Sequence, residues 1–291
     1  MFAPTGRRPR AEVRCTSVQA LPSLLALAAA LVLAPGAQRA LTAAGMVREN
    51  YRGRALPCPM GLVVVAAAVL ALTPCALLDE LAGTDSLRPE LSLILPYALG
   101  VAVLGLADDA FSGSERGWRG HARAVLRGGF STGALKAAGS LGLALYVLAG
   151  RGLGDGRYLL AAAALVLATN AFNLLDLRPG RAVKAFVALG AGLTLGAWDV
   201  KPLAALGLFA APVLVVGWLD LRERGMLGDT GSNLVGALAG LWLVLTLSTT
   251  GLAVATAALI VLTVYGEARS ISKLVERVPP LRFLDSLGRP R

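Results

Sequence analysis

Residues 59–78 read PMGLVVVAAAVLALTPCALL and contain no charged side chain. A helix of about 20 predominantly apolar residues is long enough to cross the hydrocarbon core of a bilayer. Comparable runs recur at 18–36, 59–78, 91–107, 132–150, 158–175, 182–198, 202–219, 231–249 and 252–266. Lipid offers no hydrogen bonds to the backbone, so such runs are expected to form helices, which satisfy their own backbone groups. The sequence therefore predicts an all-α, polytopic membrane protein with about nine transmembrane helices in a single membrane domain, 1–291.

The composition argues against most other classes of protein. Of the 291 residues, 56% are hydrophobic and only 16% are charged, and the mean hydropathy is +0.66. A soluble domain has about 25% charged residues, and a disordered chain needs low hydrophobicity. Three cysteines are too few and too scattered for a disulfide framework, and a single histidine, His121, excludes a multi-histidine metal site. No nucleic-acid-binding module is visible, so the positive-inside rule better explains the net charge of +10.

The basic residues indicate an orientation in the membrane. The loops after the first, third, fifth, seventh and ninth runs carry 18 lysines and arginines, whereas the opposite loops and the N-terminal segment carry 8. Cytoplasmic loops are enriched in these residues, so we expect the C-terminal segment, 267–291, to be cytoplasmic and the N-terminus to lie outside. The arginines of the basic N-terminal segment, 1–17, oppose this orientation. They also resemble a signal-peptide n-region, with 35–37 as a cleavage zone, but eight further apolar runs favour an uncleaved first helix.

Four carboxylates lie at the ends of apolar runs on this expected cytoplasmic face. They are the adjacent pair Asp108 and Asp109, then Asp176, then Asp229. Carboxylates are common in solvated loops, but adjacent acids raise each other's pKa unless a cation neutralises them. A carboxylate at the membrane edge is also costly without a partner. Clusters rich in oxygen suit Mg²⁺, which shares its coordination shell with waters and substrate phosphates, so the pattern favours a magnesium site.

The segments around these acids have further chemical features. Residues 105–109 read GLADD, residues 170–176 read NAFNLLD, and residues 228–233 read GDTGSN. The third segment is rich in glycine and lies at an expected helix start, where free backbone N–H groups can receive a phosphate. The same residues would also make an ordinary capped helix start. The two interpretations are compatible, so this segment alone decides little.

Taken in order, these segments resemble a known family. With residues 50–61, NYRGRALPCPMG, and residues 131–136, STGALK, they are similar to the motifs of the polyprenyl-phosphate N-acetylhexosamine-1-phosphate transferases. That superfamily includes phospho-N-acetylmuramoyl-pentapeptide transferase and the undecaprenyl-phosphate GlcNAc-1-phosphate transferases. The resemblance covers the chain from about Asn50 to Gly288. It implies transfer of a sugar-1-phosphate from a UDP-sugar to polyprenyl phosphate, with release of UMP, for cell-envelope polymer synthesis in the plasma membrane.

The resemblance also implies roles for individual residues. Asp229 is expected to bind Mg²⁺, assisted by Asp108, while Asp108 and Asp109 position or deprotonate the lipid phosphate. The implied catalytic set is Asp108, Asp109, Asp176 and Lys136. The implied substrate-binding set is Asn170, Asn173, Arg52, Gly231, Ser232 and Arg282, with Arg54 a weaker candidate. Lys136 has a second interpretation as a lysine that snorkels from an apolar helix, and His121 is expected to be a loop residue. The implied partners are the polyprenyl phosphate lipid, a nucleotide-sugar, the membrane and a second copy of the chain in a homodimer.

The chain also departs from the family pattern. Pro179 stands where the family commonly has a second aspartate, and residues 280–288, PLRFLDSLG, contain no histidine where the family usually has a cluster. These differences indicate a divergent branch with another donor or a reduced site. One alternative is therefore a catalytically silent or regulatory membrane homologue. A second is a small-solute transporter, for which the acids would lie near the bilayer midplane.

Overall fold

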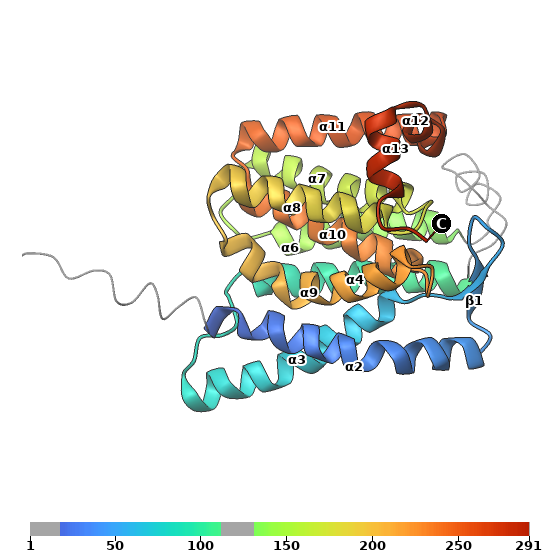
Figure 1. The fold of residues 1–291 in the computed structure, drawn as a ribbon. Coiled ribbons are helices and arrows are strands. Elements are labelled where there is room, and N and C mark those ends of the chain that lie inside the picture. Colours follow the sequence, from blue (N-terminus) through green and yellow to red (C-terminus); the bar gives the residue numbers. More distant parts are fainter. Residues whose placement is uncertain (1–17, 112–130, 291) are drawn as a thin grey trace, which may run out of the picture.

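The structure is a computed structural model that describes residues 18–111 and 131–290. These residues are nearly all helical (Figure 1). The long helices are α2 (Leu21–Ala43), α3 (Gly61–Ala82), α4 (Leu91–Phe111), α6 (Thr132–Leu148), α7 (Asp155–Leu175), α8 (Arg181–Ala197), α9 (Lys201–Leu221), α10 (Gly228–Thr246) and α11 (Thr249–Ala268). Two short helices follow, α12 (Ile271–Arg277) and α13 (Pro279–Ser286). Strands β1 (Val47–Glu49) and β2 (Ala55–Pro57) form an antiparallel pair between α2 and α3, in which Arg48 is opposite Leu56.

Every apolar run of the sequence forms a helix, which confirms a nearly all-α fold. Six helices of the described part are long and apolar enough to cross a membrane: α2, α3, α4, α7, α9 and α11. The expected number of nine spans is not reached by this measure. Helices α6 and α8 have only 17 residues each, and α10 begins with a polar first turn.

The first helix differs in length from the predicted run. Helix α2 continues through Pro35 and ends at Ala43, so residues 35–37 lie inside the helix. The extension contains three alanines among its seven residues, 37–43, and alanine has the highest helix propensity. The run of apolar residues therefore predicts that a helix forms here but not where it ends.

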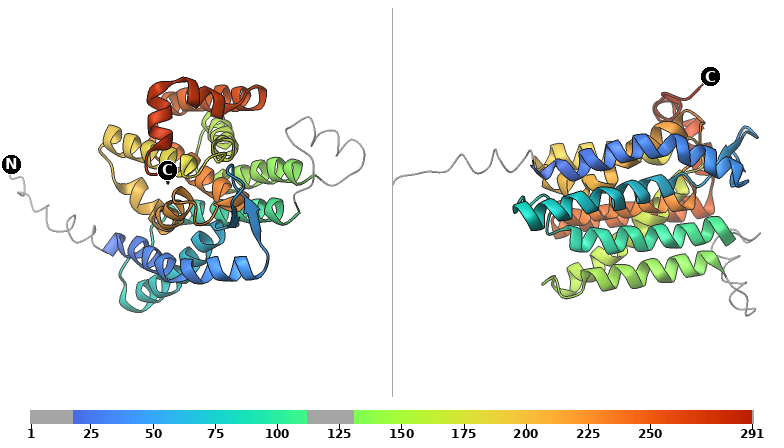
Figure 2. Two further views of the ribbon diagram at one scale, coloured as in Figure 1. Left: turned by 45° about the vertical axis from the view of Figure 1, so that its right-hand side comes forward. Right: turned by 90° about the horizontal axis from the view of Figure 1, so that it is seen from below.

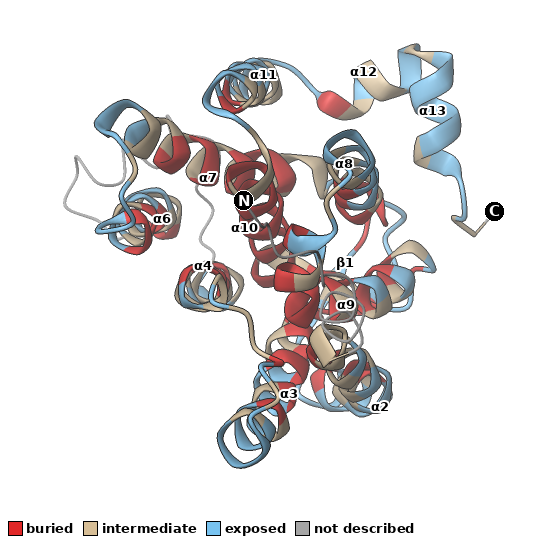
Figure 3. Cartoon of the chain, turned by 90° about the vertical axis from the view of Figure 1, so that its left-hand side faces the viewer, coloured by how far each residue is buried: buried red, intermediate tan, exposed pale blue. Residues whose placement is uncertain are grey.

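Helix α10 lies at the centre of the bundle. Residues 230–244 are all buried, on every face of the helix (Figure 3), as expected of a helix without a solvent-facing or lipid-facing side. Gly236 and Gly240 bring α10 against α7. A Cβ atom on Gly236 would lie 2.6 Å from the Cα atom of Thr169, so only glycine permits this approach.

The helices lie side by side and run roughly antiparallel (Figure 2). The β1–β2 hairpin lies at one end of the bundle, together with α12 and α13, while α2 begins at the other end (Figure 1). Helix α10 also begins at the hairpin end. The loops that the sequence assigns to a single face therefore do lie together, as far as the structure describes them.

Candidate active site

The acids at the helix ends converge around the start of α10. Asp108 lies in the last turn of α4, Asp176 directly follows α7, and Asp229 lies in the first turn of α10. The segment before α3 holds this start in place through three backbone bonds. Met60 N–H donates to Met226 O (2.8 Å), Gly61 N–H donates to Leu227 O (3.0 Å), and Met226 N–H donates to Pro57 O (2.9 Å).

Close backbone contacts bring α3 and α4 to the first turn of α10. A Cβ atom on Gly61 would overlap the backbone of Gly231, and one on Gly105 would overlap the carbonyl group of Asp229. Gly231, expected to bind substrate, is thus buried in a helix contact and offers no side chain. Gly105 places Asp108, one turn later on α4, beside α10.

Lys136 is shared by two carboxylates. Its Nζ atom donates to Asp108 Oδ2 at 2.8 Å and lies 3.4 Å from Asp229 Oδ2. The three side chains are only 13–29% exposed. Lys136 therefore does not snorkel into open solvent; it occupies a position between the two acids that a bound cation could share or take over.

Asn173 and Ser232 complete this group. With the Asn173 amide oriented to satisfy all its neighbours, its nitrogen donates to Asp229 Oδ1 and to Ser232 Oγ, and its oxygen accepts from Lys136 Nζ, each at 3.0 Å. Four helices thus contribute to one polar cluster: α4, α6, α7 and α10. Sequence reasoning had proposed all five members of it, namely Asp108, Lys136, Asn173, Asp229 and Ser232.

Asp109 has a different role from its neighbour Asp108. Its Oδ1 atom accepts from Asp229 N–H (3.0 Å), and its Oδ2 atom accepts from Thr230 N–H (2.8 Å) and Thr230 Oγ1 (2.7 Å). Arg48 binds the same carboxylate at 3.1 Å, and the Asp109 side chain is only 2% exposed. Asp109 therefore caps α10 from another helix. It occupies the backbone N–H groups at which a phosphate was expected, so the capped helix start is the arrangement observed.

Asp176 is an acid without a direct partner. The described residues provide no hydrogen bond or ion pair to its carboxylate. Burial, and next the charges of Asp220 and Asp229, raise the pKa of Asp176 well above its ordinary value. Asp108 and Asp229 thus share the cation of Lys136, and Asp176 adds a third acid near Asp229. A divalent cation would favour the charged forms of these acids.

Arg52 and Arg54 are held by a buried acid that sequence reasoning missed. Arg52 Nη1 lies 3.4 Å from Glu223 Oε1, and Arg54 Nη1 lies 3.3 Å from Glu223 Oε2. Asn50 and Tyr51 also donate to Glu223, whose side chain is fully buried. Both arginines are therefore paired with this one carboxylate, which balances one of their two charges. The sequence does contain one indication that Glu223 has a partner. It lies just after the end of α9, where the helix dipole disfavours a negative charge.

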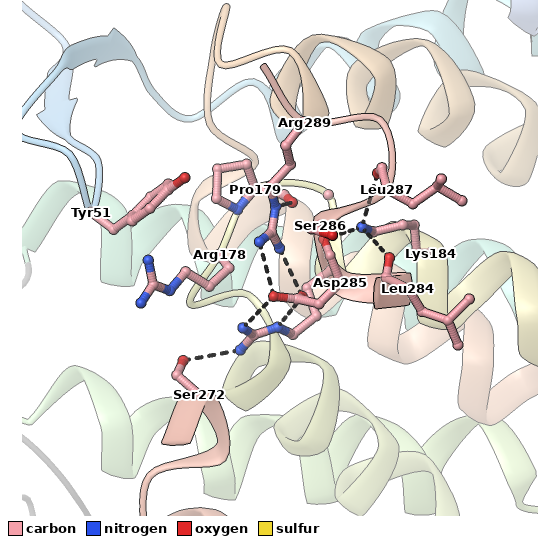
Figure 4. Close-up of polar contacts among 12 residues, drawn as sticks. Tyr51, Arg178, Pro179, Lys184, Ser272, Leu284, Asp285, Ser286, Leu287 and Arg289 are labelled. Atoms are coloured by element: carbon pink, nitrogen blue, oxygen red, sulfur yellow. Dashed lines mark hydrogen bonds and ion pairs between the residues drawn. The ribbon is translucent and has the colours of Figure 1, made fainter. Parts of the chain in front are cut away.

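The place of the family's second aspartate is covered by the C-terminal segment (Figure 4). Arg289 Nε donates to Pro179 O at 2.8 Å, and Asp285 is bound by both Arg181 (2.7 Å) and Arg289 (2.8 Å). Lys184 Nζ donates to the backbone carbonyls of Leu284, Asp285 and Leu287 at the end of α13. These bonds hold α13 against the start of α8.

The remaining candidates lie apart from the polar cluster. Arg282 is exposed on α13, and Asn170 lies one turn before Asn173 on α7 without a side-chain hydrogen bond to the described residues. His121 lies outside the described residues. Cys58 is buried near the acids, and burial, with the charge of Asp109, raises the pKa of its thiol to about 12. In this environment the neutral thiol is favoured at pH 7.

The polar cluster is also a candidate magnesium site. Among residues 18–111 and 131–290, no group of three or more His, Cys, Asp and Glu side chains is placed to hold a metal by itself. Mg²⁺ needs less, because it is commonly bound by one or two carboxylates together with waters and substrate phosphates. The oxygens of Asp108 and Asp229, both within reach of one lysine amine, fit this mode of binding.

Neither known protein families nor curated protein sequences provide a match to this chain.

Proposed function

We propose that this protein spans the plasma membrane nine times and transfers a sugar-1-phosphate from a UDP-sugar to polyprenyl phosphate. One observation carries the proposal: Lys136 lies between Asp108 and Asp229, with Asn173 beside them, where four helix ends meet. The cluster contains more carboxylates than cations and would lie at the edge of the membrane. A substrate that brings phosphates and Mg²⁺ to this place would balance its charge.

The reaction requires charge stabilisation more than acid–base chemistry. An oxygen of the lipid phosphate attacks the β-phosphorus of the UDP-sugar. The bond from that phosphorus to the oxygen bridging the α- and β-phosphates breaks, and UMP leaves with the bond electrons. A phosphate monoester has its second pKa near 6, so the attacking oxygen is already ionised at pH 7. When bound, Mg²⁺ supplies Lewis-acid stabilisation of the developing charge on the phosphates.

The residues of the cluster divide the remaining tasks. Asp108 and Asp229 would hold Mg²⁺, and Lys136, released from these acids, would bind a phosphate oxygen. Asn173 keeps Asp229 and Lys136 oriented through its amide, and Asp176 lies near Asp229, where a bound divalent cation would favour its charged form. Asp109 keeps the start of α10 in place and does not touch substrate.

The position of the acids also bears on the transporter alternative. Asp108, Asp176 and Asp229 all lie within one turn of a helix end, whereas transporters place their polar sites near the bilayer midplane. The excess of Lys and Arg in the loops of this end supports a cytoplasmic location for it, with the N-terminus outside. A UDP-sugar is a cytoplasmic metabolite, so this orientation suits the proposed donor.

A catalytically silent homologue is the second candidate. It is favoured by Arg52 and Arg54, which are both paired with Glu223, and by Arg282, which is exposed on α13. In this arrangement few arginines remain to bind a diphosphate. The retained cluster around Lys136 favours the enzyme instead.

The test is UMP release by the purified protein in detergent. Undecaprenyl phosphate is supplied with a panel of UDP-sugars, with Mg²⁺ or with EDTA. We expect release that depends on both lipid and Mg²⁺, and that is lost in Asp229→Asn and Lys136→Gln. Asp155→Asn, which removes an exposed carboxylate from the other end of α7, is the matched control and should retain activity. A folded protein that releases no UMP from any donor would refute the transferase.

A further inference from the structure

A basic pocket lies where α11 ends and α12 begins. It has a volume of about 370 Å³, and its lining includes Tyr265, Arg269, Ser270, Lys273 and Arg277. Helices α11 and α12 lie at the edge of the bundle (Figures 1 and 3). The pocket is therefore distant from the centre of the bundle and contains none of the residues of the polar cluster around Lys136.

The pocket concentrates positive charge without a counter-charge. Three of its lining side chains are cationic, and none is acidic. Within the described part of the chain, Arg269, Lys273 and Arg277 make no side-chain hydrogen bond or ion pair. The nearby Glu276 is paired with Arg178 at 3.1 Å, and Glu267 does not line the pocket. Like charges gathered in this way repel one another and favour binding of an anion.

The neighbouring surface of α11 is apolar and faces outward. Only 11% of the most apolar 18-residue stretch of α11 is buried, which is the lowest share among the six candidate spans. Val254, Val261 and Val264 lie along this face and are 61–68% exposed. Tyr265, the next residue after Val264, lines the pocket. A lipid could thus place its acyl chains on the valines and its headgroup in the pocket.

We propose that this pocket binds the headgroup of an anionic phospholipid from the leaflet at the hairpin end of the bundle. The three cations would contact the phosphate, and the hydroxyl groups of Tyr265 and Ser270 would contact its oxygens or the headgroup. This site is separate from the proposed transferase site, and its occupancy does not depend on that activity. Bound lipid would hold α12 and α13 at the membrane surface.

The size of the effect follows from the charge. Each Lys or Arg close to an anionic membrane surface strengthens attraction about fivefold, so removal of three is expected to weaken binding roughly 100-fold. The experiment is native mass spectrometry of the full-length protein in detergent, titrated with phosphatidylglycerol or phosphatidylcholine. The pocket variant combines Arg269→Gln, Lys273→Gln and Arg277→Gln. The matched control combines Arg39→Gln, Arg222→Gln and Arg224→Gln, which remove the same charge outside the pocket.

We expect phosphatidylglycerol to bind more tightly than phosphatidylcholine, with the preference lost in the pocket variant and kept in the control. Equal binding of both lipids to the natural protein, or an equal loss in both triple variants, would overturn the proposal. A third arm adds inorganic phosphate at millimolar concentration. Complete displacement of the lipid there would identify a site for free phosphate and contradict the lipid assignment. If the pocket variant fails to fold, Lys273→Gln alone must weaken phosphatidylglycerol binding about fivefold, and unchanged binding would refute the proposal.

Discussion

The substitution Asp109→Asn tests whether the two adjacent aspartates have separate roles. Asn keeps the shape of the side chain but has a single acceptor oxygen. With that oxygen at the Oδ2 position, the two bonds from Thr230 survive in weaker, neutral form, while the amide nitrogen faces Asp229 N–H and the guanidinium of Arg48. A hydrogen bond to a charged group contributes about 1.5–3 kcal/mol. The loss of one such bond and the weakening of two others amount to ~2–4 kcal/mol.

The assay is thermal unfolding of the purified protein in detergent. At roughly 2 °C per kcal/mol for a chain of this size, the unfolding midpoint should fall by about 4–8 °C. Asp108→Asn is the matched control. Asp108 bonds Lys136 and lies near Asp229, so its neutralisation leaves Lys136 paired with Asp229 and should shift the midpoint by less than ~2 °C. Equal shifts in the two variants, or an unchanged midpoint in Asp109→Asn, would refute the separation of roles.

Three further predictions concern the metal ligand, the C-terminal segment and the central helix. Asp229→Asn should abolish Mg²⁺-dependent UMP release and leave the unfolding midpoint within about 2 °C of the natural protein; retained release would remove Asp229 from the metal site. The bonds of Arg181 and Arg289 lower the pKa of Asp285 to about 2, from about 3.9 in an unfolded chain. This carboxylate therefore stabilises docking of α13 above pH 4 and loses that effect as the pH falls toward 2. Hydrogen exchange of α13, corrected for intrinsic rates, should accelerate over that range and already be fast at pH 7 in Asp285→Asn. Gly236→Ala would place a methyl group 2.6 Å from a backbone atom of α7 and should lower the unfolding midpoint, whereas Gly142→Ala, with open space around it, should not; an equal effect at both sites would contradict the close approach of α10.

The helices and the clustering of the acids were predictable from the sequence. Long apolar runs leave the backbone few alternatives to helix, and each run of the sequence does form one. Antiparallel helices joined by short loops bring alternate loops to the same end. The acids lie together for this reason, because each is found where an apolar run reaches the same end of the bundle. They are Asp108, Asp176 and Asp229.

Other features depend on contacts between distant parts of the chain. Glu223 binds residues of the β1–β2 hairpin, about 170 positions earlier, and nothing local in the sequence indicates that pairing. The burial of α10 on all faces shows in the sequence only as apolarity, which lipid-facing helices share. By length and hydropathy, six of the nine predicted spans qualify, and α6 and α8 are shorter, with 17 residues each.

The adjacent aspartates show why a motif does not assign chemistry by itself. Successive residues of an α-helix point about 100° apart, so the side chains of Asp108 and Asp109 point in different directions. Asp109 turns to the first turn of α10 and fixes its position, while Asp108 turns to Lys136 and Asp229. Asp229 owes its place beside Lys136 to the cap that Asp109 provides. Loss of either aspartate is therefore expected to remove the proposed activity by a different route. The unfolding midpoint separates the residue that holds the site together from the residue proposed to act in it.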